Sequence, residues 1–128
     1  MIGAVIIDDE DVNIKLIERL IKKECATINI LGVSSTKTGA VELINKVHPD
    51  LIFMDVSLDA SNTGFDVLEE IEPLDAKVIF VTSHDEFAIK AFDYNTIAYI
   101  VKPIEKKDLI VAVNKAIQEL EDKMYTKD

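Results

Sequence analysis

The sequence predicts an α/β fold in which five parallel strands form one doubly wound sheet with helices on both faces. Short apolar runs alternate along the chain with segments in which apolar residues recur at helical spacing. The runs are continuous rather than alternating with polar residues, as is typical of parallel strands buried on both faces. No linker or low-complexity stretch interrupts the alternation, so we expect a single domain over residues 1–128.

The first half of the chain supplies three of these strands and two helices. The strands are expected at residues 4–8, 28–33 and 51–55, where the apolar runs lie. Asp11 is the expected N-cap of the first helix, because its carboxylate can accept hydrogen bonds from the first free amides. Pro49 is expected to end the second helix, since proline cannot continue a helix. The apolar positions that define the two helices are Val12, Leu16, Ile17, Leu20, Ile21, Ala40, Val41, Leu43, Ile44 and Val47.

The second half continues with strands at residues 77–82 and 97–101 and with three helices. The first of these helices is expected to end at Pro73, the next to be capped by Asp85, and the last to begin near Glu105. Their apolar positions are Phe65, Val67, Leu68, Ile71, Phe87, Ala88, Ala91, Phe92, Leu109, Val113, Ala116, Ile117 and Leu120. Strand–helix units joined by right-handed crossovers resemble a flavodoxin-like sandwich, and that analogy implies the strand order 2-1-3-4-5.

The composition excludes several classes of protein. The net charge of −10 and the pI of about 4.6 give a surface that repels phosphate backbones, so we expect this domain to bind no nucleic acid. The single Cys25 allows no internal disulfide and fits a reducing compartment. No basic segment precedes the first apolar run, and no run approaches the roughly 20 apolar residues of a membrane span. We therefore expect a cytoplasmic domain without a membrane segment.

Polar side chains suited to phosphate chemistry lie at the ends of most of the apolar runs. Asp8 and Asp9 follow the first run, Asp55 the third, Thr82 the fourth and Lys102 the fifth. Because the carboxyl ends of parallel strands share one edge of a sheet, these groups are expected to converge in one crevice. Carboxylate oxygens are the ligands that Mg²⁺ prefers, and an ammonium and a hydroxyl suit a phosphoryl group. The sequence therefore predicts a site for a divalent cation and a phosphoryl group.

Each of these residues also has an interpretation without chemistry. Asp8 and Asp9 could cap the first helix, and because Glu10 and Asp11 continue the acidic run, part of it is expected to be a solvated face. Asp55 could initiate a turn, be a third metal ligand, or be a nucleophile that forms an acyl phosphate. The threonine could be an ordinary strand residue and the lysine a surface residue. Only their joint placement favours a site.

Four short motifs occur in the order and at the spacings of a known family. They are Ile-Ile-Asp-Asp-Glu at residues 6–10, Phe-Met-Asp at 53–55, Val-Thr-Ser at 81–83 and Tyr-Ile-Val-Lys-Pro at 99–103. With these motifs, essentially the whole chain resembles the receiver domain of two-component response regulators. The stretch from residue 82 to residue 104 is similar to receivers found ahead of LytTR-type DNA-binding domains.

The resemblance implies roles for the residues at the strand ends. Asp55 would accept the phosphoryl group. Asp8, Asp9, Asp55 and the backbone carbonyl of Ser57 would hold Mg²⁺. Lys102 would pair with a phosphoryl oxygen. The phosphoryl donor would be a sensor histidine kinase or a phosphotransfer protein, and the domain would catalyse only its own phosphorylation and dephosphorylation, so we do not expect an enzyme with a separate substrate.

The resemblance also implies a switch. Thr82 would hydrogen-bond to the phosphoryl group, Tyr99 would be the aromatic switch residue, and Ser57 and His84 would tune dephosphorylation. The face made by the fourth helix, fifth strand and fifth helix would then change and control an output, expected to be transcription through a domain outside this chain. The alternative is a receiver that docks to other proteins independently of phosphorylation.

A homodimer could form through that same face. Lys90, Asp93, Lys106 and Lys107 could make charge pairs across it, although an ordinary solvated helix surface explains these residues equally well.

One loop departs from the family pattern. Asp59 stands where many receivers have a proline, and Gly64 comes one residue late, so the loop at residues 58–63 is longer and its geometry is left open. Two other classes fit the sequence less well. The acids at residues 8–10 would repel the phosphate of a flavin cofactor. A haloacid-dehalogenase-type phosphatase would need a second acid two residues after its nucleophile, where Asp55 has Ser57.

Overall fold

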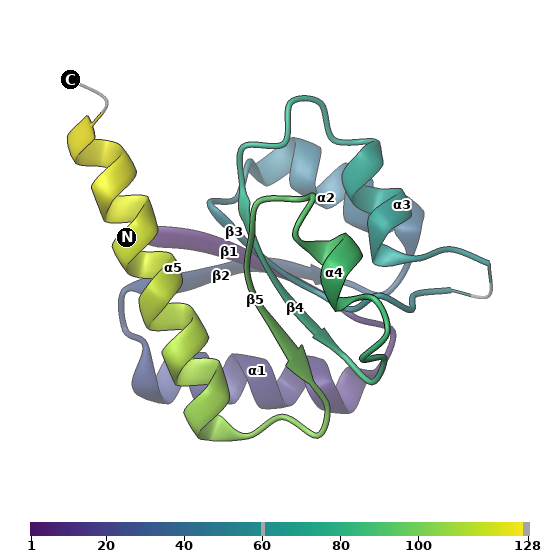
Figure 1. The fold of residues 1–128 in the computed structure, drawn as a ribbon, viewed down its shortest axis with the longest axis horizontal. Coiled ribbons are helices and arrows are strands. Elements are labelled where there is room, and N and C mark those ends of the chain that lie inside the picture. The colour runs from purple at the N-terminus through teal and green to yellow at the C-terminus, as the bar shows by residue number, and fades with distance from the viewer. Residues whose placement is uncertain (60, 127–128) are drawn as a thin grey trace.

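The computed structural model describes residues 1–59 and 61–126 and confirms the predicted fold class (Figure 1). Five parallel strands form one sheet in the order β2-β1-β3-β4-β5. The elements in chain order are β1 (Ile2–Ile7), α1 (Asp11–Glu24), β2 (Ile28–Ser34), α2 (Lys37–Val47), β3 (Leu51–Met54), α3 (Gly64–Glu69), β4 (Lys77–Thr82), α4 (Ala88–Ala91), β5 (Thr96–Val101) and α5 (Lys106–Thr126). Among the described residues, none of the helices combines the length and apolar character needed to cross a membrane.

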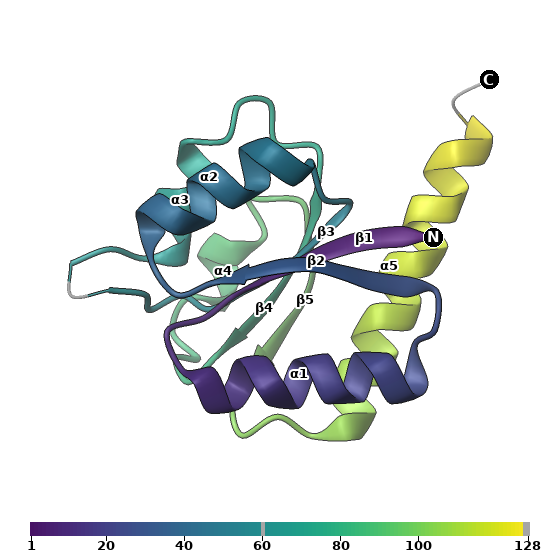
Figure 2. The ribbon, with the colours of Figure 1, turned by 180° about the vertical axis from the view of Figure 1, so that it is seen from behind.

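Two helical layers enclose the sheet, as Figures 1 and 2 show from opposite sides. α1 and α5 pack on one face, and α2, α3 and α4 pack on the other. Successive side chains of a strand point to opposite faces, so each strand contributes to both cores. Ile6 and Phe53 are buried in the first core, and Val5 and Phe80 are buried in the second. This two-sided burial is the reason that the strands appear in the sequence as continuous apolar runs.

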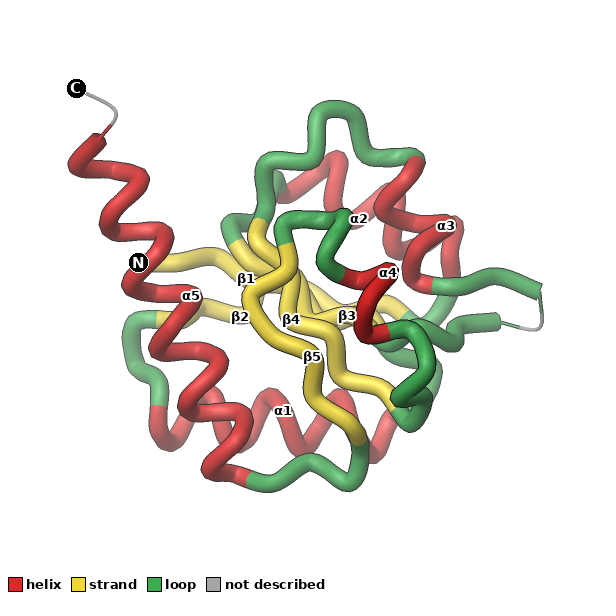
Figure 3. Tube along the Cα trace, viewed as in Figure 1, coloured by secondary structure: helices red, strands yellow, loops and turns green. Residues whose placement is uncertain are grey.

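The register of the sheet determines which strand ends lie side by side. Ile7 of β1 pairs with Met54 of β3, and Thr82 of β4 pairs with Val101 of β5. The residues that follow β1 and β3 therefore leave the sheet next to each other. Figure 3 shows the loops that join these strand ends to the helices that follow.

The start of α1 differs from the prediction. Glu10, not Asp11, is the N-cap residue, and its side chain makes no capping hydrogen bond. Asp11 is the first helical residue, and its carboxylate lies 3.0 Å from the ammonium of Lys15. The predicted Asp11 cap was wrong because the Asp8 carboxylate accepts a hydrogen bond from the Glu10 backbone N–H at 2.8 Å, which turns the chain into the helix one residue earlier.

The start of α4 also differs. Asp85 does not cap this helix; Phe87 is the N-cap residue and makes no side-chain capping bond. The ring of Phe87 packs edge-on against Phe65, with centroids 6.1 Å apart. This packing holds the segment before α4 against α3. The helix itself is the short segment Ala88–Ala91. Phe92 at its end is 60% exposed.

α3 ends earlier than predicted and begins with a cap that the sequence analysis did not identify. It stops at Glu69 rather than at Pro73, because the next two amides, of Glu70 and Ile71, donate to carbonyls three residues back and so close the helix with a tighter turn. At its start, Thr63 Oγ1 accepts a hydrogen bond from the Asp66 N–H at 3.3 Å, and the Asp66 carboxylate accepts one from the Thr63 N–H at 2.8 Å. These reciprocal bonds form a capping box.

Replacing Thr63 by alanine is expected to lower the free energy of unfolding by about 1 kcal/mol, because half of the capping box is lost. Urea unfolding followed by circular dichroism measures the difference. Thr63→Ser keeps the hydroxyl and is expected to unfold close to the original protein. Equal stability of the alanine and serine variants would contradict the capping role.

Candidate functional site

The buried polar residues among those described are Asp8, Asp55 and Thr82, and all of them lie at one edge of the sheet. Asp8 and Asp55 are only 1% and 4% exposed. The Asp55 N–H donates to the Ile7 carbonyl at 2.9 Å, which extends the pairing of β1 and β3 by one residue. The two carboxylates are therefore held at the ends of neighbouring strands by the backbone of the sheet itself.

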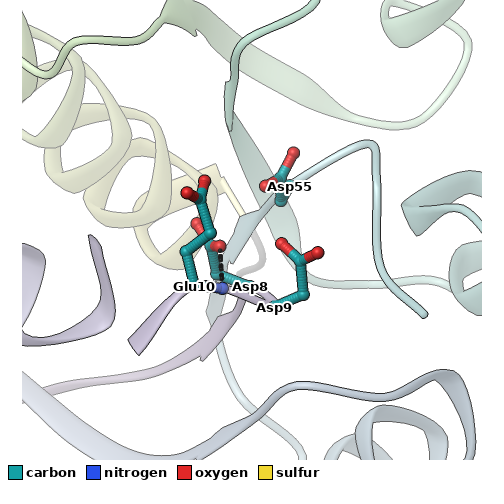
Figure 4. Close-up of side chains that lie close together, drawn as sticks. All are labelled: Asp8, Asp9, Glu10 and Asp55. Carbon is teal, nitrogen blue, oxygen red and sulfur yellow. Dashed lines mark hydrogen bonds between the residues drawn. The ribbon is translucent and has the colours of Figure 1, made fainter. Parts of the chain in front are cut away.

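Four carboxylates gather at this edge. Asp8, Asp9, Glu10 and Asp55 each offer an oxygen, and these oxygens all lie within 4.8 Å of one another. Figure 4 shows the four side chains around the ends of β1 and β3. The structure thus brings together the three predicted acids and adds Glu10, which the sequence analysis had left among the capping or solvated acids. The signal that could have identified Glu10 was its place directly after the Asp-Asp pair.

Lys102 lies among these acids. Its side chain is 7% exposed, and Nζ is 3.0 Å from Asp8 Oδ2, 2.9 Å from Glu10 Oε1 and 2.9 Å from Asp55 Oδ2. The Lys102 N–H donates to the Thr82 carbonyl at 2.8 Å, which fixes the start of the side chain beside β4. Burial alone would lower the pKa of the ammonium, but its contacts with the carboxylates outweigh burial and raise that pKa. Lys102 is therefore a permanently charged group.

One ammonium does not balance the acids of the site. Burial raises the pKa of Asp8 to about 6, and it also raises the pKa of the more exposed Asp9. The negative charge of Asp55 acts in the same direction on both. Within the described part of the chain, Asp8 Oδ2 is a buried oxygen that accepts no hydrogen bond, although Lys102 Nζ lies at ion-pair distance. The site therefore has oxygen atoms and negative charge to offer a further cation.

Thr82 and Tyr99 lie on the adjacent strands β4 and β5, and both contact the loop that follows β4. Thr82 is fully buried at the end of β4, and its Oγ1 accepts a hydrogen bond from the His84 N–H at 3.4 Å. Tyr99 on β5 is half-buried, and its ring centroid lies 5.8 Å from that of Phe80. The Tyr99 hydroxyl donates to the backbone carbonyl of His84. The loop after β4 therefore contacts both residues.

Ser57 and His84 are in direct contact. Ser57 Oγ lies 2.8 Å from His84 Nε2, and the Ser57 N–H donates to Asp55 Oδ1 at 3.2 Å. A histidine and a serine that are 27 positions apart are thus joined beside the Asp55 carboxylate. Their positions, two residues after Asp55 and two after Thr82, predict that both lie near the site but do not predict this bond.

The lengthened loop after β3 has a defined role. Asp59 Oδ2 accepts a hydrogen bond from the Lys37 N–H, the first amide of α2, at 3.1 Å. Asp59 also accepts from the Asn62 side chain. The loop closes where Ser57 forms a bridge with Thr63, and there Gly64 begins α3. Asp59 thus ties the loop to α2, on the side of the sheet that carries α3.

Two of the charged residues considered for a dimer have partners within the chain. Lys90 Nζ lies 4.5 Å from the centroid of the Phe65 ring, and Lys106 Nζ lies 2.8 Å from Glu24 Oε1. These contacts hold α4 to α3 and α5 to α1.

Comparisons with known proteins agree with this geometry. The family model described as response regulator receiver domain matches residues 4–114. The sensory transduction protein LytR of Staphylococcus epidermidis is 33% identical over 127 residues, which are 98% of this chain and 49% of that protein. The transcriptional regulatory protein BtsR of Salmonella typhi is 30% identical over 120 residues, or 93% of this chain and 49% of that protein. The chain spans about half the length of the curated relatives it matches.

Solved structures have the same fold. The REC domain of AraT from Geobacillus stearothermophilus superposes with a TM-score of 0.86 at 23% identity, covering 96% of this chain and 98% of that one. A DNA-binding response regulator of the LuxR family from Staphylococcus aureus gives a TM-score of 0.80 at 27% identity, covering 91% and 98%. The strand order, the motifs and the family match agree, and the chain belongs to the response regulator receiver domains, the signalling domains of two-component systems.

Proposed function

We propose that this domain is a switch in which Asp55 accepts a phosphoryl group from the phosphohistidine of a sensor histidine kinase or a phosphotransfer protein. The observation that carries the proposal is the setting of Asp55. Its buried carboxylate lies 2.9 Å from the Lys102 ammonium and shares the acid cluster with Asp8 and Asp9. A carboxylate can act as a nucleophile and form a covalent acyl phosphate when nearby positive charge stabilises the product.

The donor set of the same cluster fits Mg²⁺. This ion takes oxygen ligands and usually keeps several waters, so few carboxylates suffice. We assign Asp8, Asp9, Asp55 and the backbone carbonyl of Ser57 as its ligands. The observation that favours a cation here is the excess of acids, because four carboxylates gather around the single Lys102 ammonium. When bound, the ion would offset the negative charge of the acids and of the incoming phosphoryl group.

The residues of the chain would promote the transfer by position and charge. An Asp55 oxygen attacks phosphorus, so that a P–O bond forms while the P–N bond of the donor breaks and its imidazole leaves. Lys102 already contacts Asp55 and would stay within reach of the new phosphoryl oxygens. Thr82 would donate its hydroxyl to one of them, and Tyr99 would respond to the movement of the loop after β4. Ser57 and His84, beside Asp55, would tune the hydrolysis that resets the switch.

Intact-mass measurement after incubation with Mg²⁺ and acetyl phosphate tests the proposal. We expect a mass increase of a single phosphate that requires Mg²⁺ and is lost in Asp55→Asn. Asp11→Asn is the matched control, because Asp11 is an exposed aspartate that pairs with Lys15 outside the acid cluster. If neither acetyl phosphate nor a phosphohistidine protein produced the increase, the proposal would fail in favour of a phosphorylation-independent docking domain.

The output is proposed to pass through the face formed by α4, β5 and α5, which lie side by side in Figure 1. Large apolar side chains are exposed there: Ile89 at 91%, Phe92 at 60%, Val101 at 44% and Val111 at 64%. Because the relatives LytR and BtsR are about twice as long and are named as a sensory transduction protein and a transcriptional regulator, we propose control of transcription through a further domain. The net charge of −10 argues against DNA binding by this domain itself. We also propose that the protein is cytoplasmic.

Phosphorylation is expected to promote self-association through the same face, and Val111→Glu is expected to prevent it, because a charge would replace an exposed apolar contact. Light scattering after size-exclusion chromatography, with and without acetyl phosphate, measures the association. Val12→Glu is the control, since Val12 is a similarly exposed valine on α1. Association of the Val111 variant at the level of the unmodified sequence would exclude this face as the dimer interface.

A further inference from the structure

His84 lies where several segments around the site meet. Its ring nitrogen Nε2 contacts Ser57 Oγ at 2.8 Å, on the loop that follows Asp55. Its backbone N–H donates to Thr82 Oγ1 at 3.4 Å, and its backbone carbonyl accepts the hydrogen bond of the Tyr99 hydroxyl. His84 therefore contacts the loop that follows Asp55, the end of β4 and the side chain of Tyr99 on β5.

The His84 ring is held in one orientation. It packs edge-on against Phe87, with centroids 5.8 Å apart, and Glu86 Oε2 lies 3.6 Å from Nδ1. The Ser57 hydroxyl can donate to Nε2 or accept from it, so this contact is a hydrogen bond in either tautomer of His84. Ser57 is itself fixed through its N–H, which donates to Asp55 Oδ1 at 3.2 Å.

These contacts form a continuous path from the phosphoacceptor to the tyrosine. The path runs from the Asp55 carboxylate to the Ser57 backbone, from the Ser57 hydroxyl to the His84 ring, and from the His84 carbonyl to the Tyr99 hydroxyl. The contact of the Thr82 side chain with His84 is longer, at 3.4 Å, than either hydrogen bond on the path from Asp55 to the His84 ring, at 3.2 and 2.8 Å.

We propose that the Ser57–His84 hydrogen bond positions Tyr99. It does so by holding in place the His84 carbonyl, which accepts the hydrogen bond of the Tyr99 hydroxyl. Ser57 and His84 are then positioning residues for the switch, in addition to any effect on hydrolysis. A displacement of the loop at Ser57, such as a phosphoryl group on Asp55 would cause, reaches Tyr99 through this bond. That a signal passes from Asp55 to Tyr99 through this bond rests on the proposed function. That the bond positions Tyr99 does not, because the contacts are present in the unphosphorylated domain.

Fluorine NMR of the chain labelled with 3-fluorotyrosine tests the proposal. The chain has only three tyrosines, and Tyr99→Phe assigns the resonance of interest. Ser57→Ala and His84→Leu are expected to shift or broaden the Tyr99 resonance in the unphosphorylated protein and to reduce its change on adding Mg²⁺ and acetyl phosphate. His84→Gln is expected to restore the original resonance, because its amide can reach Ser57 from the place of Nε2.

Two references separate this effect from a general loss of structure. Ser83→Ala removes an exposed serine of the same loop and is expected to leave the Tyr99 resonance unchanged. The Tyr94 resonance, which reports the contact of that residue with Glu69, is expected to stay constant in every variant.

An unchanged Tyr99 resonance in both Ser57→Ala and His84→Leu would overturn the inference, and so would an equal change in Ser83→Ala. A protein that gains no phosphate would instead overturn the proposed function, and the comparison of unphosphorylated variants would still decide the role of the bond.

Discussion

Replacing Lys102 by methionine is expected to lower the free energy of unfolding by about 3 kcal/mol in the absence of divalent cations. Methionine has a similar length but no charge, so the acids of the site lose the ammonium that lies within 3.0 Å of each contacting oxygen. Asp8 and Asp55 are nearly inaccessible to solvent, and their mutual repulsion would be poorly screened. Urea unfolding in the presence of a chelator measures the loss.

Mg²⁺ provides the matched test of this explanation. If charge is the cause, adding Mg²⁺ should stabilise the Lys102→Met variant more than the unmodified protein, because the ion would offset the same carboxylates. Lys106→Met is the control, since Lys106 is 58% exposed and pairs with Glu24 at the surface, where a lost ion pair has little effect. A Lys102 variant as stable as the Lys106 variant would show that the buried ammonium does not hold the site together.

Replacing Gly64 by alanine is expected to destabilise the domain by about 2 kcal/mol and to slow the phosphorylation of Asp55. A Cβ at this position would lie 2.3 Å from the Asp55 carbonyl oxygen and 2.6 Å from Met54 Cγ. The Gly64 N–H also donates to the Val56 carbonyl at 2.7 Å, so the backbone at this point is held against the strand end. Any relief of the clash must move the main chain that carries Asp55.

Gly39→Ala is the control for this substitution. Gly39 lies in α2, where alanine favours the helix, and a Cβ there would meet the side-chain oxygens of Ser34 at 2.6 Å and of the capping Thr36 at 3.0 Å rather than backbone atoms. Thermal unfolding and the initial rate of mass increase with acetyl phosphate measure both effects. An alanine at position 64 that left stability and rate unchanged would show that the loop after Asp55 can adjust without moving the acid.

Most of the site was predictable because it lies at strand ends. A continuous apolar run identifies a buried parallel strand, and the residue after it lies at the edge where such strands expose their carboxyl ends. The predicted grouping of Asp8, Asp55, Thr82 and Lys102 at one edge of the sheet is confirmed by their contacts. The chemical roles assigned to these residues remain predictions that the experiments above address.

Two of the errors lie at the starts of helices. Asp11 and Glu10 are both acids before an apolar stretch, and the Asp8 side chain decided which of them begins the helix. Asp85 is an acceptable cap by type, but α4 begins only at Ala88, after Phe87, which packs on Phe65. The first boundary thus depends on a side chain two residues away, and the second lies beside a ring contact with α3.

The sequence by itself determined the alternation of strands and helices and the chemical groups at the sheet edge, because side-chain periodicity and strand-end position are local properties. Only the tertiary structure decided where the longer side chains go. Glu10 joins the acid cluster because it meets Lys102, 92 positions away, and Ser57 meets His84 across 27 positions. Such contacts depend on which loops the packed sheet places side by side. They also depend on burial, because a charge that loses its water is stable only when another group pairs with it.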